Sequence, residues 1–178
     1  MRELRLPLTR EEIMSLRAGD PVSLSGVIYT ARDCAHRRIF EYLDAGIPLP
    51  VRLEGAVIYY AGPCPAKPGY ASGSCGPTTS ARMDRYAPRL FDLGLNCTIG
   101  KGEMCKEVRQ AIIRNVSCYF AAIGGAGALY GKAIRKSECV AFPDLLSEAI
   151  HRLEIESFPA VVAMDCYGGN IYDRGKIQ

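Results

Sequence analysis

A segment rich in glycine and proline, from Gly62 to Pro77, places the firmest limit on how this chain can fold. Glycine and proline interrupt helices and strands, so the segment is predicted to be a loop between regular elements. A loop of this length inside a compact domain usually has a function of its own. It runs directly into the sequence Gly-Pro-Thr-Thr-Ser-Ala-Arg-Met-Asp at residues 76–84, which is therefore the first candidate for a functional motif.

The motif at residues 76–84 combines groups that bind anions. Thr78, Thr79 and Ser80 supply three consecutive hydroxyls, and Arg82 follows four residues after the first of them. Hydroxyls and backbone N–H groups at a helix start are suited to hold an anion, and arginine adds a forked cationic donor. The Gly-x-x-x-x-Gly-Lys-Ser/Thr pattern of a nucleotide P-loop is absent from the sequence, so a carboxylate fits the motif better than a nucleotide.

Two further groups of polar residues are candidates for the same site. Lys101 lies between two glycines just before a predicted helix, where it is either an exposed turn residue or a cation facing an anion at the helix N-terminus. Arg32, Asp33 and His36 lie where a predicted strand meets a predicted helix, a position that often carries binding residues. Alternatively, these three residues have a structural role, in which Asp33 caps the helix and Arg32 and His36 are exposed to solvent.

The apolar pattern predicts strands and helices that mingle without a strict strand–helix–strand repeat. Predicted strands cover residues 22–29, 51–60, 116–123 and 159–165, with a short final strand after the turn at residues 167–170. Predicted helices cover residues 9–19, 33–46, about 86–94, a segment around 108–113, and about 142–151. Residues 124–127 are predicted to form a tight packing turn. We expect one α/β domain over residues 1–178 with a mixed sheet, residues 1–19 forming an N-terminal helical extension.

The composition supports one globular domain and argues against several classes of protein. The 178 residues are 48% hydrophobic and 23% charged, enough to build a core. The net charge of +3 is small and dispersed, so nucleic-acid binding is not expected. Apolar runs are shorter than the ~20 residues that cross a bilayer, and the N-terminus does not resemble a secretory signal. We therefore expect a cytoplasmic protein without a membrane partner.

The cysteines and histidines do not predict a metal site. None of the eight cysteines forms a Cys-x-x-Cys pair, the arrangement common in zinc and iron–sulfur sites, so most are expected to be small buried apolar residues. His36 and His151 are the only histidines, which excludes a histidine-rich metal site. A Gly-x-Ser-x-Gly elbow is also absent, so a serine hydrolase is not supported.

Four short stretches, taken in order, resemble one known family. They are Thr-Ala-Arg-Asp-x-Ala-His-Arg-Arg from Thr30, Gly-Pro-Thr-Thr-Ser-x-Arg-Met-Asp from Gly76, Ile-Gly-Lys-Gly from Ile99, and Gly-Gly-Ala-x-Ala-Leu from Gly124. Together they are similar to the β part of the iron–sulfur hydro-lyases of the class I fumarase and tartrate dehydratase group. This part is either the C-terminal half of a long chain or a separate subunit, and the similarity runs from about Asp20 to the end.

The resemblance implies a swivelling β/β/α domain and a hydro-lyase activity. The reaction would be the reversible addition of water to fumarate to give L-malate, or the equivalent dehydration of tartrate. It uses an oxygen-sensitive [4Fe–4S] cluster whose cysteine ligands belong to the α part, so no metal ligand is expected in this chain. The implied partners are a cluster-bearing α subunit and a C4 dicarboxylate substrate, in a hetero-oligomer.

The resemblance also implies roles for individual residues. Arg32, Arg82 and Lys101 match positions that bind the substrate carboxylates. Thr79 matches a neighbouring hydrogen-bond donor to the substrate. Thr78 matches the threonine proposed as the base that removes the carbon-bound proton, although a hydroxyl is a weak base unless its alkoxide is stabilised or a partner relays the proton.

Asp33 and His36 match the first stretch of the resemblance and are expected to support Arg32 rather than to act chemically. The leading hypothesis is thus the β subunit of a two-subunit fumarate hydratase, active only with its α subunit. The β subunit of L-tartrate dehydratase is the alternative enzyme. A non-catalytic domain that binds a dicarboxylate is the alternative from a different class.

Overall fold

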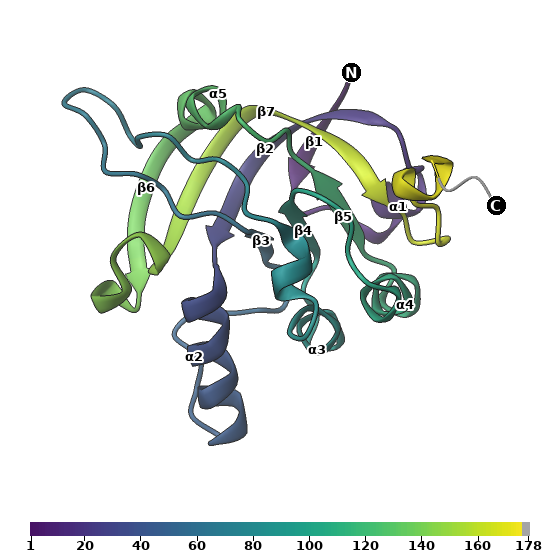
Figure 1. Ribbon diagram of the computed structural model, residues 1–178, viewed down its shortest axis with the longest axis horizontal. Helices are drawn as coiled ribbons and strands as arrows, with labels where there is room; N and C mark the ends of the chain where they lie inside the picture. Colours follow the sequence, from purple (N-terminus) through teal and green to yellow (C-terminus); the bar gives the residue numbers. More distant parts are fainter. Residues whose placement is uncertain (176–178) are drawn as a thin grey trace.

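Seven β-strands form one mixed sheet in the computed structural model, which describes residues 1–175 (Figure 1). The strands are β1 (Arg2–Leu6), β2 (Pro21–Thr30), β3 (Val57–Tyr59), β4 (Cys97–Gly100), β5 (Cys118–Ala121), β6 (Ile134–Ala141) and β7 (Ile150–Met164). Strands β1 to β5 lie in sequence order and pair in parallel. Strands β3 and β4 are buried throughout and β5 is nearly so, as is usual for parallel strands with both faces covered.

The long strand β7 closes the sheet. It pairs antiparallel with β2, where Val22 lies opposite Ala160, and also with β5, where Phe120 lies opposite Val162. The first part of β7 carries β6 as an additional antiparallel neighbour. The ring of strands β2, β3, β4, β5 and β7 is therefore complete, and the carboxyl ends of three parallel strands, β2 to β4, meet at one end of it.

Helices and short 3₁₀ turns cover the sheet. The α-helices are α1 (Arg10–Met14), α2 (Asp33–Asp44), α3 (Ala87–Asp92), α4 (Lys106–Asn115) and α5 (Gly127–Ala133). The 3₁₀ turns are η1 (Ser80–Met83), η2 (Pro143–Glu148) and η3 (Ile171–Gly175). Helix α5 lies on one side of the sheet, whereas α2, α3 and α4 lie on the other (Figure 1).

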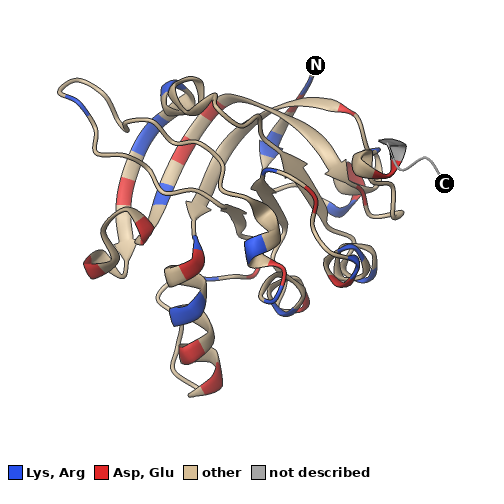
Figure 2. Cartoon of the chain, viewed as in Figure 1, with Lys and Arg blue, Asp and Glu red and all other residues tan. Residues whose placement is uncertain are grey.

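The sheet has an apolar core on each face. Neighbouring residues of β3 point to opposite faces, as the pleat of a strand requires. Tyr59 joins the core that includes Tyr130 of α5, whereas Ile58 joins the core that includes Phe91 of α3 and Val108 of α4. Basic and acidic residues both occur on α2, β6 and β7, so the charges of either sign are interspersed (Figure 2). Within residues 1–175, no helix is long and apolar enough to cross a membrane.

The predicted fold class is confirmed, since the structure is a mixed α/β domain with a sheet flanked by helices. The N-terminal segment differs from the prediction. The helix predicted at residues 9–19 does begin with a capping box, formed by Thr9 and Glu12, but it ends at Met14 and is preceded by β1. Because β1 pairs with β2 from Arg2 to Leu6, residues 1–19 contribute to the sheet as well as to a helix.

Several element bounds also differ from the prediction. The strand predicted at residues 51–60 is confined to β3, and the helix predicted at 142–151 is the short turn η2, which a left-handed backbone at Leu146 interrupts. Strand β7 starts at Ile150, well before the predicted start at Pro159. Proline is common at the first residue of a strand, but here it lies inside one. Strand β6, rich in polar residues, was not predicted, and η3 replaces the predicted final strand.

Candidate active site

Most of the residues singled out in the sequence follow the carboxyl ends of neighbouring parallel strands. Arg32 follows β2 and begins α2, and Lys101 follows β4. The motif at residues 76–84 returns from the long loop to the end of β3, where Pro77 pairs with Ala61. In α/β proteins, in closed barrels as well as in open sheets, ligands commonly bind beyond the carboxyl ends of parallel strands, and this position therefore marks a candidate active site.

The backbone of the motif is inserted between the ends of β3 and β4. The N–H of Thr78 donates to the carbonyl of Tyr60 (2.6 Å), and the N–H of Lys101 donates to the carbonyl of Thr78 (3.3 Å). The N–H of Ser80 in turn donates to the carbonyl of Lys101 (2.8 Å). These three hydrogen bonds bring Thr78, Thr79 and Lys101 together beyond the ends of β3 and β4. Their role in a site stays a prediction.

Gly100 permits this close approach. A Cβ atom built on Gly100 would lie 2.0 Å from Ser80 Oγ and 2.8 Å from the ring of Tyr60. Ser80 is fully buried, and its Oγ lies 2.8 Å from the hydroxyl of Tyr119, which donates its own proton to the carbonyl of Gly102 (2.7 Å). The third hydroxyl of the motif therefore fixes the backbone rather than facing outward, whereas Thr79 is exposed and Thr78 half-buried.

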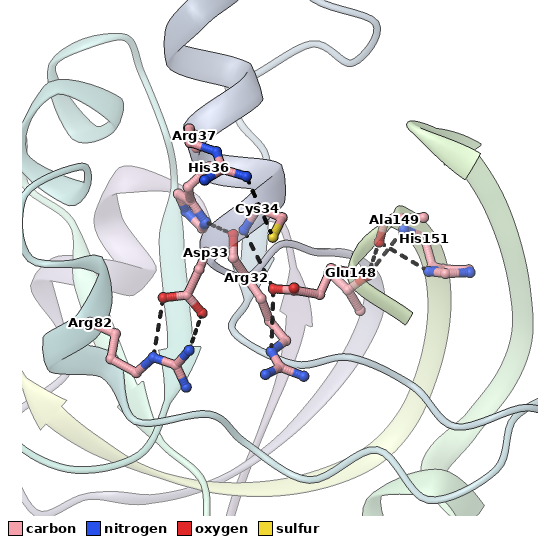
Figure 3. Close-up of polar contacts among 10 residues, drawn as sticks. Arg32, Asp33, Cys34, His36, Arg37, Arg82, Glu148, Ala149 and His151 are labelled. Atoms are coloured by element: carbon pink, nitrogen blue, oxygen red, sulfur yellow. Dashed lines mark hydrogen bonds and ion pairs between the residues drawn. The ribbon is translucent and has the colours of Figure 1, made fainter. Parts of the chain in front are cut away.

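Arg82 is held by a carboxylate from another element. Its Nε donates to Asp33 Oδ1 (3.1 Å) and its Nη2 lies 2.7 Å from Asp33 Oδ2, a bidentate contact that joins η1 to the start of α2 (Figure 3). The helix itself begins with Arg32 as its N-cap residue, and no side chain caps it. Asp33 therefore does not act as the helix cap that its sequence position suggested, and it contacts Arg82.

The carboxylate beside Arg32 belongs to Glu148, at the end of η2. Arg32 Nε lies 3.8 Å from Glu148 Oε1, and the N–H of Cys34 donates to the same oxygen at 3.4 Å (Figure 3). Gly62 also packs against the arginine, because a Cβ atom there would be 3.0 Å from Arg32 Nη1. Glu148 is a contact that the sequence analysis missed.

His36 lies behind the site and not in it. Its ring is fully buried between Tyr60 and Tyr86, and its Nδ1 lies 2.8 Å from the backbone carbonyl of Arg32. Burial lowers the pKa of this imidazole from 6.5 to about 4, even though the hydrogen bond to Arg32 opposes the shift. At neutral pH the ring is therefore uncharged, with the Nδ1 proton donated to that carbonyl.

The glycine-rich segment at residues 124–127 borders the site. Gly124 and Gly125 form the predicted turn, and a Cβ atom on Gly124 would contact the Lys101 side chain, 3.5 Å from its Cδ. Gly127 begins α5 and packs against the loop, with its carbonyl accepting a hydrogen bond from the N–H of Cys75 (3.0 Å). The small residues thus let the lysine and the loop approach the same helix start.

Cysteine and histidine side chains do not gather into a ligand set. Among residues 1–175, no group of three or more His, Cys, Asp or Glu side chains is placed to hold a metal ion. The eight cysteines are all free thiols; Cys75, Cys97, Cys118 and Cys166 are buried, and burial raises the pKa of Cys75 to about 12. The residues present therefore do not fit an iron–sulfur cluster.

The site itself is open in the isolated chain. Thr79 and Arg82 are exposed, while Arg32 and Lys101 are half-buried. A pocket of about 580 Å³ lies between the long loop and η2, and none of the predicted site residues lines it. Guanidinium, ammonium and hydroxyl groups held at the ends of strands can bind a carboxylate. The surface that these groups form in this chain does not by itself enclose a ligand.

The fold and the site together define a small α/β domain with basic and hydroxyl side chains at the carboxyl ends of its parallel strands. The Fumarase C-terminus family matches residues 2–175. The chain is 40% identical to fumarate hydratase 2 of Leishmania major and 39% identical to the anaerobic class I fumarate hydratase of Escherichia coli. These matches cover 97% and 92% of this chain, which spans about a third of either relative (31%).

A third relative is a much shorter protein. It comes from Methanocaldococcus jannaschii, is named as a candidate L(+)-tartrate dehydratase subunit beta, and is 40% identical over 94% of this chain and 89% of its own length. The chain belongs to the Fumarase C-terminus family.

Proposed function

We propose that this chain is the β subunit of a two-subunit hydro-lyase that interconverts fumarate and L-malate. In this proposal the chain supplies carboxylate-binding and proton-transfer residues to a site that a partner α subunit completes. The observation that carries the proposal is the hydrogen-bonded insertion of Thr78 and Thr79 beside Lys101, with Arg82 following in η1. Relatives named as fumarate hydratases and as a dehydratase subunit support it.

The exposure of the site supports a shared arrangement. Addition of water to a double bond needs a site that excludes bulk water, since electrostatic stabilisation weakens in high dielectric. Thr79 and Arg82 are exposed in this chain, so another surface must cover them during catalysis. We assign that surface to the α subunit, which would also hold the [4Fe–4S] cluster. When bound, such a cluster supplies Lewis-acid activation of the departing hydroxyl.

The residues of this chain have distinct roles in the proposal. Arg32, Arg82 and Lys101 bind the carboxylates, and Thr79 donates a hydrogen bond to the substrate. Removal of a proton next to a carboxylate builds further negative charge on that carboxylate. Cations that are already in place stabilise this charge without having to reorganise during the reaction. In a site that excludes water, they lower the free energy of the transition state by several kcal/mol.

Thr78 is assigned the transfer of the carbon-bound proton. A threonine hydroxyl accepts a proton only if neighbouring positive charge stabilises its alkoxide. The backbone N–H of Lys101 donates a hydrogen bond to the carbonyl of Thr78, which places a cationic residue directly beside the threonine. This backbone contact is the structural support for the assignment.

Tartrate is the second candidate substrate. The relative from Methanocaldococcus jannaschii, which this chain nearly covers, is named for a tartrate dehydratase. Tartrate and malate are both hydroxylated C4 dicarboxylates, and the same three cations can bind either one. Tartrate has one hydroxyl more than malate. The groups that face the carbon bearing this extra hydroxyl in the assembled enzyme therefore determine which of the two substrates is preferred.

The test is an anaerobic assay of this chain co-expressed with the cluster-bearing chain of the same source. Fumarate, L-malate and both enantiomers of tartrate are supplied separately. Turnover of fumarate and L-malate is expected, and preferential turnover of L-tartrate would assign the alternative substrate. Absence of turnover of all four, in a preparation that contains an intact cluster, would overturn the hydro-lyase proposal and favour a non-catalytic domain that binds dicarboxylates.

A further inference from the structure

We infer that Glu148 is a positioning residue for Arg32, holding its guanidinium in the orientation that presents it to a substrate carboxylate. This inference deepens the proposed function and rests on it. Glu148 lies outside all four stretches of the resemblance and is brought to Arg32 only by the fold. The two residues come from opposite ends of the chain, at the start of α2 and the end of η2.

The carboxylate of Glu148 contacts both the side chain of Arg32 and the helix that Arg32 begins. Glu148 Oε1 lies 3.8 Å from Arg32 Nε and accepts a hydrogen bond from the N–H of Cys34 at 3.4 Å. The Arg32 Nε–H is buried without a hydrogen-bond partner among the described residues, and the ion pair compensates for its burial. One carboxylate therefore ties the arginine to its own helix.

The pair is better shielded than the ion pairs elsewhere on the surface. The side chains of Arg32 and Glu148 are 28% and 24% exposed, compared with 79% and 71% for Arg52 and Glu54. Exposed pairs are screened by water and salt and constrain little, whereas a shielded pair restricts both partners. Gly62 packs against both Arg32 and the turn, since a Cβ atom there would lie 3.1 Å from Arg32 Cδ and 2.7 Å from the Ser147 carbonyl.

The orientation of the arginine follows from which of its nitrogens faces the Glu148 carboxylate. A guanidinium has five N–H groups in a fixed fork, and a carboxylate at Nε leaves the two terminal nitrogens for another acceptor. Glu148 lies on the Nε side of Arg32, and in this proposal the terminal edge faces the substrate carboxylate. Asp33 contacts Arg82 through Nε and Nη2, and the two arginines are thus each oriented by a carboxylate from a different element.

The turn that carries Glu148 is held in a costly conformation. Phe142 and Leu146 adopt left-handed backbone angles, with φ of 55° and 53°, which residues with a Cβ atom rarely adopt. The residues that follow the turn are fixed to the end of β2, where Thr30 Oγ1 donates to the Ala149 carbonyl (3.3 Å) and accepts from the N–H of His151 (3.0 Å). Strain of this kind persists only where surrounding contacts enforce it. Here the contacts that hold the turn place the Glu148 carboxylate beside Arg32.

The first measurement is kinetic and uses the assembled enzyme. Glu148→Gln keeps the size of the side chain and removes its charge, and we expect it to raise KM for the dicarboxylate about tenfold with kcat changed less than about threefold. Asp144→Asn is the matched control, because Asp144 lies on the same turn and pairs with Arg38, away from the site. It should leave both constants unchanged.

A double-mutant cycle separates positioning from a general effect on the turn. In an Arg32→Ala background, Glu148→Gln should have no further effect on kcat/KM, since its action passes through Arg32. Equal effects of Glu148→Gln with and without Arg32, or equal effects of Glu148→Gln and Asp144→Asn, would overturn the inference. If the glutamine variant does not fold, Glu148→Asp replaces it. The aspartate keeps the negative charge, but its shorter side chain holds the carboxylate farther from Arg32, and we expect the same rise in KM.

The second measurement needs no catalytic activity. The Nε–H resonance of Arg32, assigned by its loss in Arg32→Ala, should shift in Glu148→Gln and stay unchanged in Asp144→Asn in NMR spectra of this chain alone. An unchanged resonance in Glu148→Gln would refute the positioning role whatever the enzyme does. A shifted resonance with an inactive wild-type assembly would instead show that the proposed function, and not this contact, is wrong.

Discussion

The Arg82 guanidinium binds both oxygens of the Asp33 carboxylate, with Nε 3.1 Å from Oδ1 and Nη2 2.7 Å from Oδ2. This contact links the 3₁₀ turn that follows the hydroxyl motif to the first turn of α2. Because Asp33 follows Arg32 directly in the chain, the pair also sets the position of one candidate substrate arginine relative to the other. The first two of the four motif stretches are thus joined by a side-chain contact.

The first prediction concerns this pair. Asp33→Asn leaves one amide oxygen to accept from Arg82, so the guanidinium loses a fixed orientation, and KM should rise about threefold to tenfold in the assembled enzyme. Arg82→Ala should raise KM and lower kcat together. Asp92→Asn is the control, since Asp92 makes an equally bidentate contact with Arg114 (2.7 and 2.7 Å) on α4. Identical kinetics for the two asparagine variants would exclude a role for Asp33.

The second prediction separates the two threonines. Thr78→Val removes a hydroxyl and keeps the shape, and kcat should fall on the order of 100-fold or more if this hydroxyl transfers the proton. Thr79→Val should mainly raise KM, because it removes a hydrogen bond to bound substrate. Steady-state kinetics of both variants distinguishes the roles. A larger loss of kcat in Thr79→Val than in Thr78→Val would reverse the assignment.

The third prediction concerns the close packing at Gly100. Gly100→Ala forces a methyl group toward Ser80 Oγ and the Tyr60 ring, and it should lower the free energy of unfolding by about 2 kcal/mol. Gly76→Ala is the control, since a Cβ atom there would come no closer than 3.5 Å, an ordinary contact with Gly127. Urea unfolding of this chain measures both. Equal stability of the two variants would contradict the packing described.

The fourth prediction concerns the buried imidazole of His36. In the unfolded chain His36 gains a proton below about pH 6.5, whereas in the folded chain, with a pKa of about 4, it is protonated only at a lower pH. Stability is therefore lost as the pH falls through this window, by about 2 kcal/mol between pH 7 and pH 5 from this group. His36→Phe should reduce that pH dependence, measured by urea unfolding at each pH. An unchanged slope would show that His36 is not buried in its neutral form.

Much of the site could be predicted from the sequence because its contacts are local or lie at strand ends. The order of hydroxyls and arginine at residues 76–84, and the glycines flanking Lys101, are visible in the sequence itself. The roles assigned to these residues remain predictions. The partner carboxylates were harder to assign, since Asp33 appeared to be a helix cap and Glu148 lies on a turn that the pattern predicted as helix.

The parts of the fold that escaped prediction depend on contacts distant in sequence. Strand β6 has a polar, largely exposed pattern, and its structure comes from pairing with β7 rather than from apolar alternation. Strand β1 becomes recognisable as a strand through its parallel register with β2. The turn η2 has left-handed residues that lack the usual glycine, which leaves no local sign of where the chain bends.

The central claim is that this chain forms one wall of a hydro-lyase site that another chain completes. The most direct test is anaerobic fumarate hydration by this chain alone, by the cluster-bearing chain alone, and by the two mixed. We predict turnover only in the mixture, and its loss when the mixture contains Arg82→Ala. Turnover by this chain alone at the rate of the mixture would contradict the claim.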